Sequence, residues 1–144
     1  MHVISPNFHL EDFACHDGTA VPEELVANVY KLVLEVLQPL RYMWAGPLIV
    51  ICGYRTPQHN VAVGGALGSA HLEAMAADIR PESAAAVDNL HAMALANWTS
   101  GKLPALGGLG HYPERWIHVD TRKAADGHLR RWEGNRVGSE PPGS

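Results

Sequence analysis

SAHLEAMAADIR, residues 69–80, places His71 and Asp78 on either side of a run of small and apolar residues, and this stretch decides how the rest of the chain is interpreted. Histidine and aspartate are both metal ligands, and small residues between them let the backbone and the ligands pack closely. A His and an Asp at this spacing have many chance matches, unlike the compact HExxH motif. A metal site therefore needs a third ligand from elsewhere in the chain.

A candidate for the third ligand lies in WIHVD, residues 116–120, which has the period of two expected of a β-strand. This alternation places Trp116, His118 and Asp120 on one face of the strand. Catalytic zinc sites use three protein ligands drawn from His, Asp, Glu and Cys, and they leave a fourth position for water. The candidate metal ligands are therefore His71, Asp78 and His118.

The segment that comes before this region predicts a long helix followed by a strand. Apolar residues recur at intervals of three and four over residues 21–46, and Pro39 is expected to bend or interrupt the helix near its end. Gly46 is expected to close it. Residues 47–55, PLIVICGYR, then predict a short buried strand that ends at Gly53.

The remaining segments alternate between loop, helix and hairpin. Residues 55–70 are rich in glycine, proline and small polar residues and predict a loop, where catalytic groups commonly lie. Residues 82–98 predict a second helix, to which alanine lends propensity. Residues 106–122 predict two short strands around a turn at Pro113 and Glu114. The expected fold class is α+β, with helices packed on a small, mostly antiparallel sheet.

Length and charge bound the function. The chain has 144 residues, which fits one domain, expected over residues 1–137, and the last residues, 138–144, predict a disordered tail. The formal net charge is −4 at pH 7, which suggests binding to neither nucleic acid nor an anionic membrane. Nine histidines are more than usual for a chain of this size, and they justify the search for a site.

The start of the chain and its cysteines indicate the compartment. MHVISPNFHLEDF has no cationic segment followed by an apolar one, and no apolar run approaches the roughly 20 residues of a membrane span. We therefore expect a soluble cytoplasmic chain that acts elsewhere only if something releases it. Cys15 and Cys52 form no CxxC pair, and they are either two buried thiols or one disulfide.

Residues 52–79, CGYRTPQHNVAVGGALGSAHLEAMAADI, followed by residues 108–122, GLGHYPERWIHVDTR, resemble the zinc D-alanyl-D-alanine carboxypeptidase and murein endopeptidase family. The GYR turn, the SxH followed by AxD, and the final HVD carry the resemblance, which extends over residues 6–132. Short members of this family occur in bacteria and in phage lytic or virion proteins, and the fold is shared with the amino-terminal domain of hedgehog proteins. The resemblance implies that one Zn²⁺ ion is bound by His71, Asp78 and His118.

The resemblance also implies two substrate-binding residues. Arg55 in the GYR turn matches the position that holds a carboxylate of the peptide substrate, and Ser69 matches the serine just before the first ligand. Arginine is suited to grip a carboxylate through two parallel hydrogen bonds. Zinc lowers the pKa of its bound water towards about 7, which makes a nucleophile at neutral pH.

The general base is where the chain departs from the family. Many members carry an acidic residue three positions before the last histidine ligand, and this chain has Arg115 there. Glu114, one residue earlier in the turn, is the first candidate for the base. Asp120 shares a face with His118 and is either the base or a partner that orients the ligand histidine. His111 is a further acid/base candidate.

Two hypotheses about function follow from these residues. The first is a zinc metallopeptidase that cuts peptidoglycan stem peptides as a D-Ala-D-Ala carboxypeptidase or a murein endopeptidase, in the manner of a phage endolysin released to act on the cell wall. The second is a non-catalytic, zinc-stabilised binding or virion structural module of the same fold. The enzyme needs an open zinc position and a base, and the module needs neither. The expected partners are stem peptides, with no nucleic acid or membrane, and the expected state is a monomer.

Overall fold

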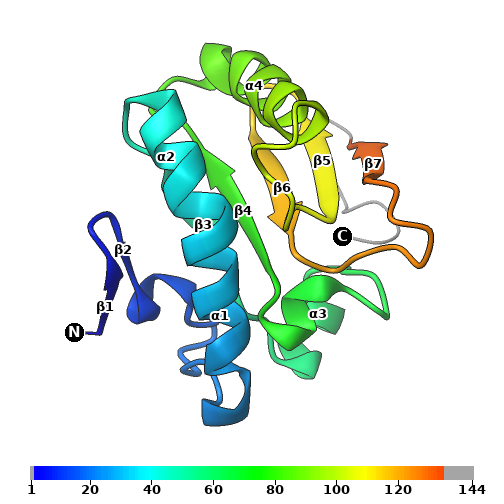
Figure 1. Cartoon of the computed structure of the whole chain (residues 1–144). Coiled ribbons are helices and arrows are strands. Elements are labelled where there is room, and N and C mark those ends of the chain that lie inside the picture. The colour runs from blue at the N-terminus through cyan, green and yellow to red at the C-terminus, as the bar shows by residue number, and fades with distance from the viewer. Residues whose placement is uncertain (1, 135–144) are drawn as a thin grey trace.

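The computed structural model describes residues 2–134, in which a five-stranded sheet forms the frame of the fold (Figure 1). The strand order is β3-β4-β6-β5-β7, and every pairing is antiparallel except that of β5 with β7. The strands are β3 Ile49–Cys52, β4 Ala76–Arg80, β5 Gly108–Tyr112, β6 Trp116–Asp120 and β7 Arg130–Glu133. This confirms the predicted α+β class with a mostly antiparallel sheet. The predicted tail and the domain boundary before it lie outside the described residues.

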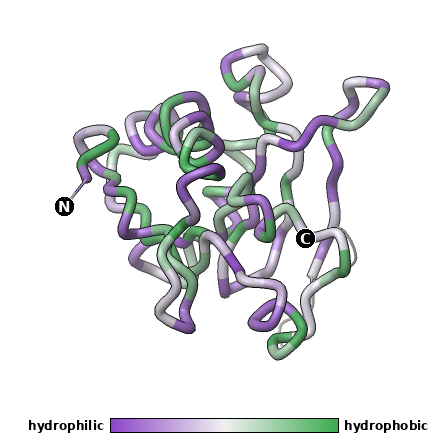
Figure 2. The backbone as a smooth tube through the Cα atoms, turned by 90° about the horizontal axis from the view of Figure 1, so that it is seen from below, coloured by the Kyte–Doolittle hydropathy of each residue, from purple (hydrophilic) through white to green (hydrophobic). Residues whose placement is uncertain are grey.

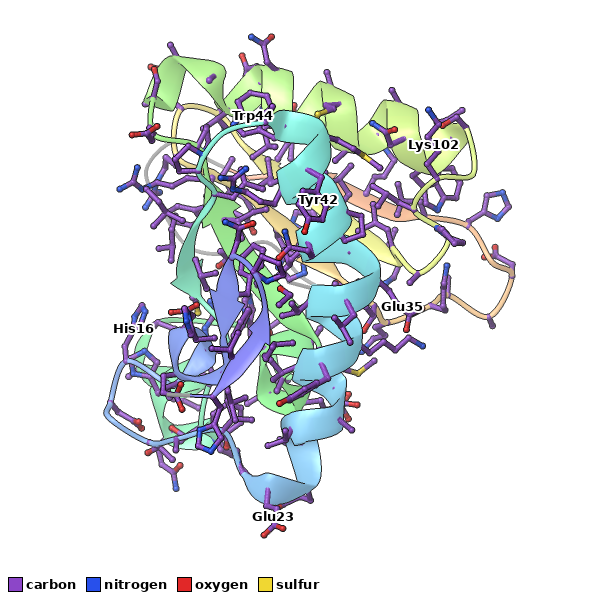
Figure 3. The ribbon with its side chains drawn as sticks, turned by 60° about the vertical axis from the view of Figure 1, so that its left-hand side comes forward. His16, Glu23, Glu35, Tyr42, Trp44 and Lys102 are labelled. Atoms are coloured by element: carbon purple, nitrogen blue, oxygen red, sulfur yellow. The ribbon has the colours of Figure 1, made fainter. Side chains whose placement is uncertain are left out.

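The predicted long helix is one rod in three parts (Figure 3). The parts are α1 Val26–Leu32, a π-helical turn Val33–Leu37 and α2 Gln38–Trp44. Pro39 has no N–H to donate and crowds the preceding turn, which accounts for the π-helical interruption directly before it. The end differs from the prediction, because Ala45 rather than Gly46 takes the left-handed position, with φ at 58°.

One face of the sheet packs against this rod and against the second predicted helix, α4 (Val87–Thr99), which a 3-10 turn at Ala84–Ala86 precedes. Alternate residues of the three central strands point into the shared core: Ala77, Ile79, Leu109, Ile117 and Val119. Side chains along a strand point to opposite faces in turn. The residues between these core positions therefore face the other side of the sheet.

The central strand β4 is one element that sequence periodicity does not predict, as are β1 (Val3–Ser5), β2 (Phe8–His9) and β7. Its residues are AADIR, and alanine favours helix over strand. All of them except Arg80 are buried, so there is no alternation of polar and apolar side chains to read. Pairing with β3 on one side and β6 on the other makes this segment a strand.

The segment predicted as a loop contains a short helix, α3 (Pro57–Ala62). The N–H of His59 donates to Oγ1 of Thr56 at 3.1 Å, and Pro57 takes the first helical position. The loop prediction is wrong over this helix. The glycine-rich composition of the segment as a whole indicates a loop, whereas Thr56 and Pro57 are the local signal for the start of a helix.

The N-terminal segment packs against the end of β3. It consists of β1 Val3–Ser5, β2 Phe8–His9 and a 3-10 turn Leu10–Phe13. The N–H of Tyr54 donates to the carbonyl oxygen of Phe13 at 2.9 Å. A Cβ on Gly53 would lie 2.7 Å from Cα of Phe13, so only glycine allows this approach. The residues that follow Phe13 are thereby brought beside the GYR turn.

Hydrophobic and hydrophilic stretches alternate along the chain in Figure 2. Within residues 2–134, no helix is both long and apolar enough to cross a membrane. Many of the apolar side chains gather instead in the one core that the rod, α4 and the sheet enclose.

The two cysteines are free and buried, so the structure shows two thiols rather than a disulfide. Cys15 belongs to the hydrophobic core, where a free cysteine behaves as a small apolar side chain. Cys52 ends β3 and is paired with Asp78 of β4.

Gly110→Ala tests the packing of β7 over β5. A Cβ at this position would lie 2.4 Å from Nε1 and 2.6 Å from Cε2 of Trp132, so the ring or the strand has to move. We expect the free energy of unfolding, measured by urea denaturation, to fall by about 1–3 kcal/mol, the usual cost of overpacking. Gly68→Ala is the control, because an added Cβ there has nothing within 4 Å. An equal loss in both variants would contradict this account.

Candidate metal centre

His71 lies in a short 3-10 turn, Ala70–Glu73, directly before β4. The N–H of His71 donates to Oγ of Ser69 at 3.2 Å, and Ser69 is fully buried. Ala74 takes a left-handed conformation, with φ at 55°, where the turn gives way to the strand. Ser69 therefore positions a candidate ligand, and its contact with substrate stays a prediction.

Asp78 on β4 lies directly opposite His118 on β6, and Cys52 on β3 is paired with Asp78 from the other side. Facing residues of paired strands project to the same side of a sheet. The three side chains therefore form a row across the sheet, on the face opposite the rod and α4.

Oδ1 of Asp78 is the atom at which the two histidines meet. It lies 3.3 Å from Nε2 of His71 and 3.2 Å from Nδ1 of His118, and both histidines are 0% exposed. Among the described residues, Nε2 of His71 has no hydrogen-bond partner although it is buried. A polar atom left in this state costs about 1–3 kcal/mol. Two imidazole nitrogens and a carboxylate oxygen are a donor set that zinc takes, so these residues fit a metal ion.

Each histidine is held by its other ring nitrogen. Nδ1 of His71 lies 2.7 Å from the carbonyl oxygen of Gly53, and Nε2 of His118 lies 2.7 Å from Oδ2 of Asp120. A carbonyl and a carboxylate oxygen only accept, so these two nitrogens carry protons, and Nε2 of His71 and Nδ1 of His118 are left as the ring atoms that would bind a metal ion beside Asp78. Metal-ligating histidines are oriented in this way in proteins.

Both oxygens of the buried Asp120 carboxylate are occupied. Besides the contact with His118, its Oδ1 accepts hydrogen bonds from the N–H of Arg122 at 3.0 Å and from Nη2 of Arg130 at 2.5 Å. Burial raises the pKa of Asp120, but the hydrogen bonds and charges of His118 and Arg130 together outweigh it and lower the pKa, so the group stays charged. Of the two roles expected for Asp120, this geometry matches the orienting partner.

Burial and charge act in opposite directions on the cluster. Burial lowers the pKa of His71, but the charge of Asp78, the hydrogen bond to Asp78 and the contact with Cys52 together raise it by more. The pKa of His118 is likewise raised against burial, by Asp120 and Asp78. Burial raises the pKa of Asp78, yet the charge of His71 and the hydrogen bond from His118 lower it well below its usual range. Without a metal ion, protons on the histidines balance the buried carboxylates.

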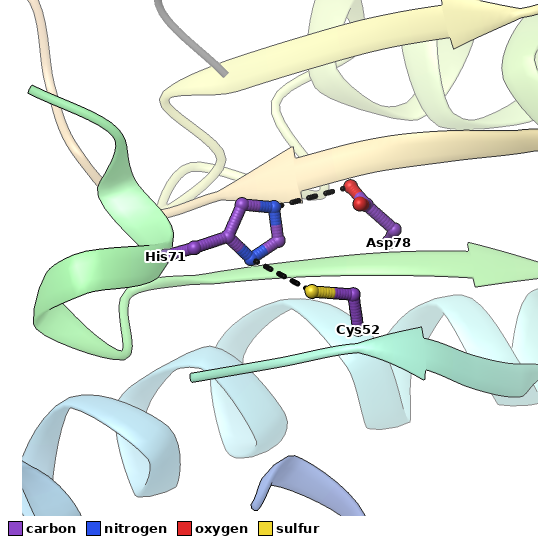
Figure 4. Close-up of side chains that lie close together, drawn as sticks. All are labelled: Cys52, His71 and Asp78. Carbon is purple, nitrogen blue, oxygen red and sulfur yellow. Dashed lines mark hydrogen bonds and ion pairs between the residues drawn. The ribbon is translucent and has the colours of Figure 1, made fainter. Parts of the chain in front are cut away.

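Cys52 is a site residue that the sequence does not predict. Its Sγ lies 3.8 Å from Nδ1 of His71, and Cys52, His71 and Asp78 offer donor atoms within 4.8 Å of one another (Figure 4). Thiolate is a zinc ligand, so two overlapping donor sets exist, with Cys52 or His118 as the third member. Nδ1 of His71 already donates to Gly53, so His71 is not a base for this thiol.

A cavity of about 200 Å³ lies beside Asp78. Its wall includes Arg55, which is 3% exposed and whose Nη2 lies 3.7 Å from Oδ2 of Asp78. Nη1 of Arg55 also donates to Oδ1 of Asn60 on α3 at 3.2 Å. Trp116 of β6 forms another part of the wall. The structure thus brings Arg55 next to the candidate metal ligands.

His111 is not brought to this site. It pairs with Ile117 and therefore projects to the side of the sheet that α4 covers. There its Nε2 lies 2.7 Å from Oδ1 of Asp88 and its Nδ1 lies 2.9 Å from Oε2 of Glu133. The acid/base role expected of His111 stays a prediction, and the structure places its ring away from the candidate metal ligands.

Glu114 lies in the exposed turn between β5 and β6. Its φ is 64°, and the N–H of Arg115 donates to the carbonyl oxygen of Tyr112 at 2.9 Å, which closes the turn. A positive φ at this position of a turn is usual for glycine and uncommon for other residues. Glu114 is not one of the residues that line the cavity beside Asp78. Its role as the general base stays a prediction.

Comparison with protein families identifies a match to the family described as Peptidase M15, over residues 6–120. The matched range begins before the N-terminal hairpin ends and closes at Asp120, so it contains the whole candidate metal centre. No curated protein and no solved structure matches the chain.

The protein kept free of metal by a chelator is predicted to lose stability as the pH rises. The pKa values of His71 and His118 are raised above the ordinary value of about 6.5. The protonated histidines therefore stabilise the fold fully below about pH 6.5, and this stabilisation is lost as the pH rises through the raised pKa values. Urea midpoints measured with a chelator from about pH 6 to about pH 9 should fall. His128→Gln removes an exposed histidine and should show the same fall. A midpoint that rises over this range would count against the raised pKa values.

Proposed function

Because the chain belongs to the peptidase M15 family, we propose that it is a zinc-dependent metallopeptidase that hydrolyses peptidoglycan stem peptides, as a D-Ala-D-Ala carboxypeptidase or a murein endopeptidase. The observation that carries the proposal is the buried meeting of His71, Asp78 and His118 at one carboxylate oxygen, with one nitrogen left unpartnered among the described residues. Three ligands of this kind leave the fourth zinc position open to water.

In this proposal three converging atoms would hold the ion: Nε2 of His71, Oδ1 of Asp78 and Nδ1 of His118. When bound, zinc polarises the scissile carbonyl and lowers the pKa of its water towards about 7. Cys52 stands outside this set because its sulfur lies near Nδ1 of His71, the nitrogen that donates to Gly53.

Arg55 is the residue proposed to hold a carboxylate of the substrate. Its guanidinium is charged at any working pH and can present two parallel N–H donors. The contacts to Asp78 and Asn60 hold the side chain in the cavity wall, where the low exposure strengthens its electrostatic attraction. A free carboxylate on a stem peptide is the chemistry that this position would recognise.

Digestion of peptidoglycan peptides by the zinc-loaded protein, followed by mass spectrometry, tests the proposal. Wild type should release D-alanine, which marks a carboxypeptidase, or open crosslinked dimers, which marks an endopeptidase. His118→Ala should abolish cleavage, because it removes a ligand and leaves the buried Asp120 carboxylate without that partner. His128→Ala, at an exposed histidine, should cleave like wild type. No cleavage by folded, zinc-loaded wild type would favour the non-catalytic module.

Asp120→Asn should weaken zinc binding by about 10–100-fold, the usual effect of removing a partner that orients a ligand histidine. The variant loses the charged acceptor that fixes the proton on Nε2 of His118. Competition with a chromophoric chelator measures the affinity. Asp126→Asn is the matched control, because that carboxylate is exposed and contacts His128 on the loop before β7. Equal affinities in the two variants would rule out the orienting role.

A further inference from the structure

Hydrolysis of an amide requires a group that moves a proton from water to the leaving nitrogen. The carboxylate of Asp120 is occupied by His118 and two arginines, and Asp78 faces both candidate ligand histidines. Glu114 lies in an exposed turn outside the cavity wall, and His111 projects from the other side of the sheet. The proton carrier is therefore expected in the cavity wall.

Two histidines line the cavity together with Arg55 and Asp78. His16 comes from the loop after the N-terminal 3-10 turn, at the outer edge of the molecule in Figure 3, and His59 comes from α3. Their rings lie 5.9 Å apart and meet edge to face at 72°. Imidazole both takes and gives protons near neutral pH, which is why histidine is the most frequent acid/base group in enzymes.

A hydrogen-bonded link next to the pair joins the two segments that carry it. Oγ1 of Thr56 donates to Oδ2 of Asp17 at 2.8 Å and accepts the N–H of His59 at 3.1 Å. Oδ1 of Asp17 accepts the N–H of Thr19 at 2.9 Å, which shapes the loop. The hydrogen bonds from Thr19 and Thr56 keep the pKa of Asp17 well below its ordinary range, so this link persists at neutral pH.

We propose that His59 is the proton carrier of the peptidase reaction and that His16 is its positioning partner in the cavity wall. The proposal rests on the proposed function. His59 is half-buried on a capped helix, whereas His16 is exposed on a loop. A side chain on a fixed helix keeps its distance to a bound substrate better than one on a loop does.

The other titratable groups of the cavity wall have different roles. Arg55 stays protonated and cannot act as a base. The thiol of Cys52 lies against the ring of His71, and Asp78 belongs to the proposed metal set. His59 and His16 are the groups in this wall to which the proposed function gives no other task.

The transfer balances without any further reactant. The neutral imidazole of His59 takes a proton from the attacking water as the C–O bond forms at the scissile carbonyl carbon. The imidazolium gives that proton to the amide nitrogen as the C–N bond breaks, and the electron pair of that bond stays on nitrogen. The products are a carboxylic acid and an amine, and His59 is neutral again.

His59→Gln in the full-length, zinc-loaded protein tests the assignment. We expect kcat on a stem peptide to fall by about 10²- to 10⁴-fold, the range that general acid–base catalysis contributes, with KM and zinc content little changed. Activity of His59→Gln should be partly restored by added imidazole, which can carry the proton in place of the missing side chain. His16→Gln should lower kcat by less. His128→Gln, at an exposed histidine outside the cavity wall, is the control and should match wild type.

Glu114→Gln separates the two candidates for the base. Retention of wild-type kcat in Glu114→Gln, together with its loss in His59→Gln, supports His59. The reverse result overturns the proposal and assigns the base to Glu114. Cleavage that survives His59→Gln overturns this assignment alone, whereas the absence of cleavage by zinc-loaded wild type removes the proposed function and this assignment with it.

Nuclear magnetic resonance on the zinc-free protein gives a readout that does not depend on turnover. A stem pentapeptide that ends in D-alanyl-D-alanine should shift the imidazole signals of His16 and His59 and leave that of His128 in place. Shifts at the cavity histidines support their contact with substrate. If the peptide perturbs Arg55 but neither cavity histidine, the proposal is overturned even where the enzyme is active.

Discussion

The register between β4 and β6 is the constraint on which the rest of the structure depends. It sets Asp78 directly opposite His118 on one face of the sheet. The same register sets Ile79 opposite Ile117 on the other face, and both isoleucines are fully buried. Because side chains alternate along a strand, a slip of one residue would turn the polar pair into the core and the apolar pair out of it. The packing of the core and the assembly of the metal centre are therefore one requirement.

Burying so many ionisable groups is unfavourable unless each charge has a partner. A continuous chain of contacts meets this need, from Arg130 through Asp120 and His118 to Asp78. This series of contacts has room because Gly108 of β5, which is opposite Asp120, has no side chain. A Cβ on Gly108 would lie 2.3 Å from Oδ2 of Asp120. Small residues on a neighbouring strand are thus part of the metal centre although they bind nothing.

The parts of the molecule that arise from local causes are predictable from the sequence. The alternation in WIHVD predicts the hairpin strand and the shared face of His118 and Asp120, and the periodic apolar residues predict both long helices. The strand β4 is not predictable in this way, because an alanine-rich segment buried on both faces has no alternation. The helix α3 is hidden for another reason, since its Thr-Pro start stands in a glycine-rich segment.

Sequence spacing cannot predict the contacts between distant segments. These contacts form two regions of the site, the buried cluster of candidate ligands and the cavity wall. The sheet fixes the buried inner region, where His71 and His118 meet Asp78, because binding a metal requires ligands that hardly move. The cavity wall that carries His16 and His59 comes from two segments, brought together where Gly53 lets the N-terminal segment approach and joined by the bond from Thr56 to Asp17. A proton carrier must reach both solvent and substrate, so it is better placed on this outer wall than among the buried charges.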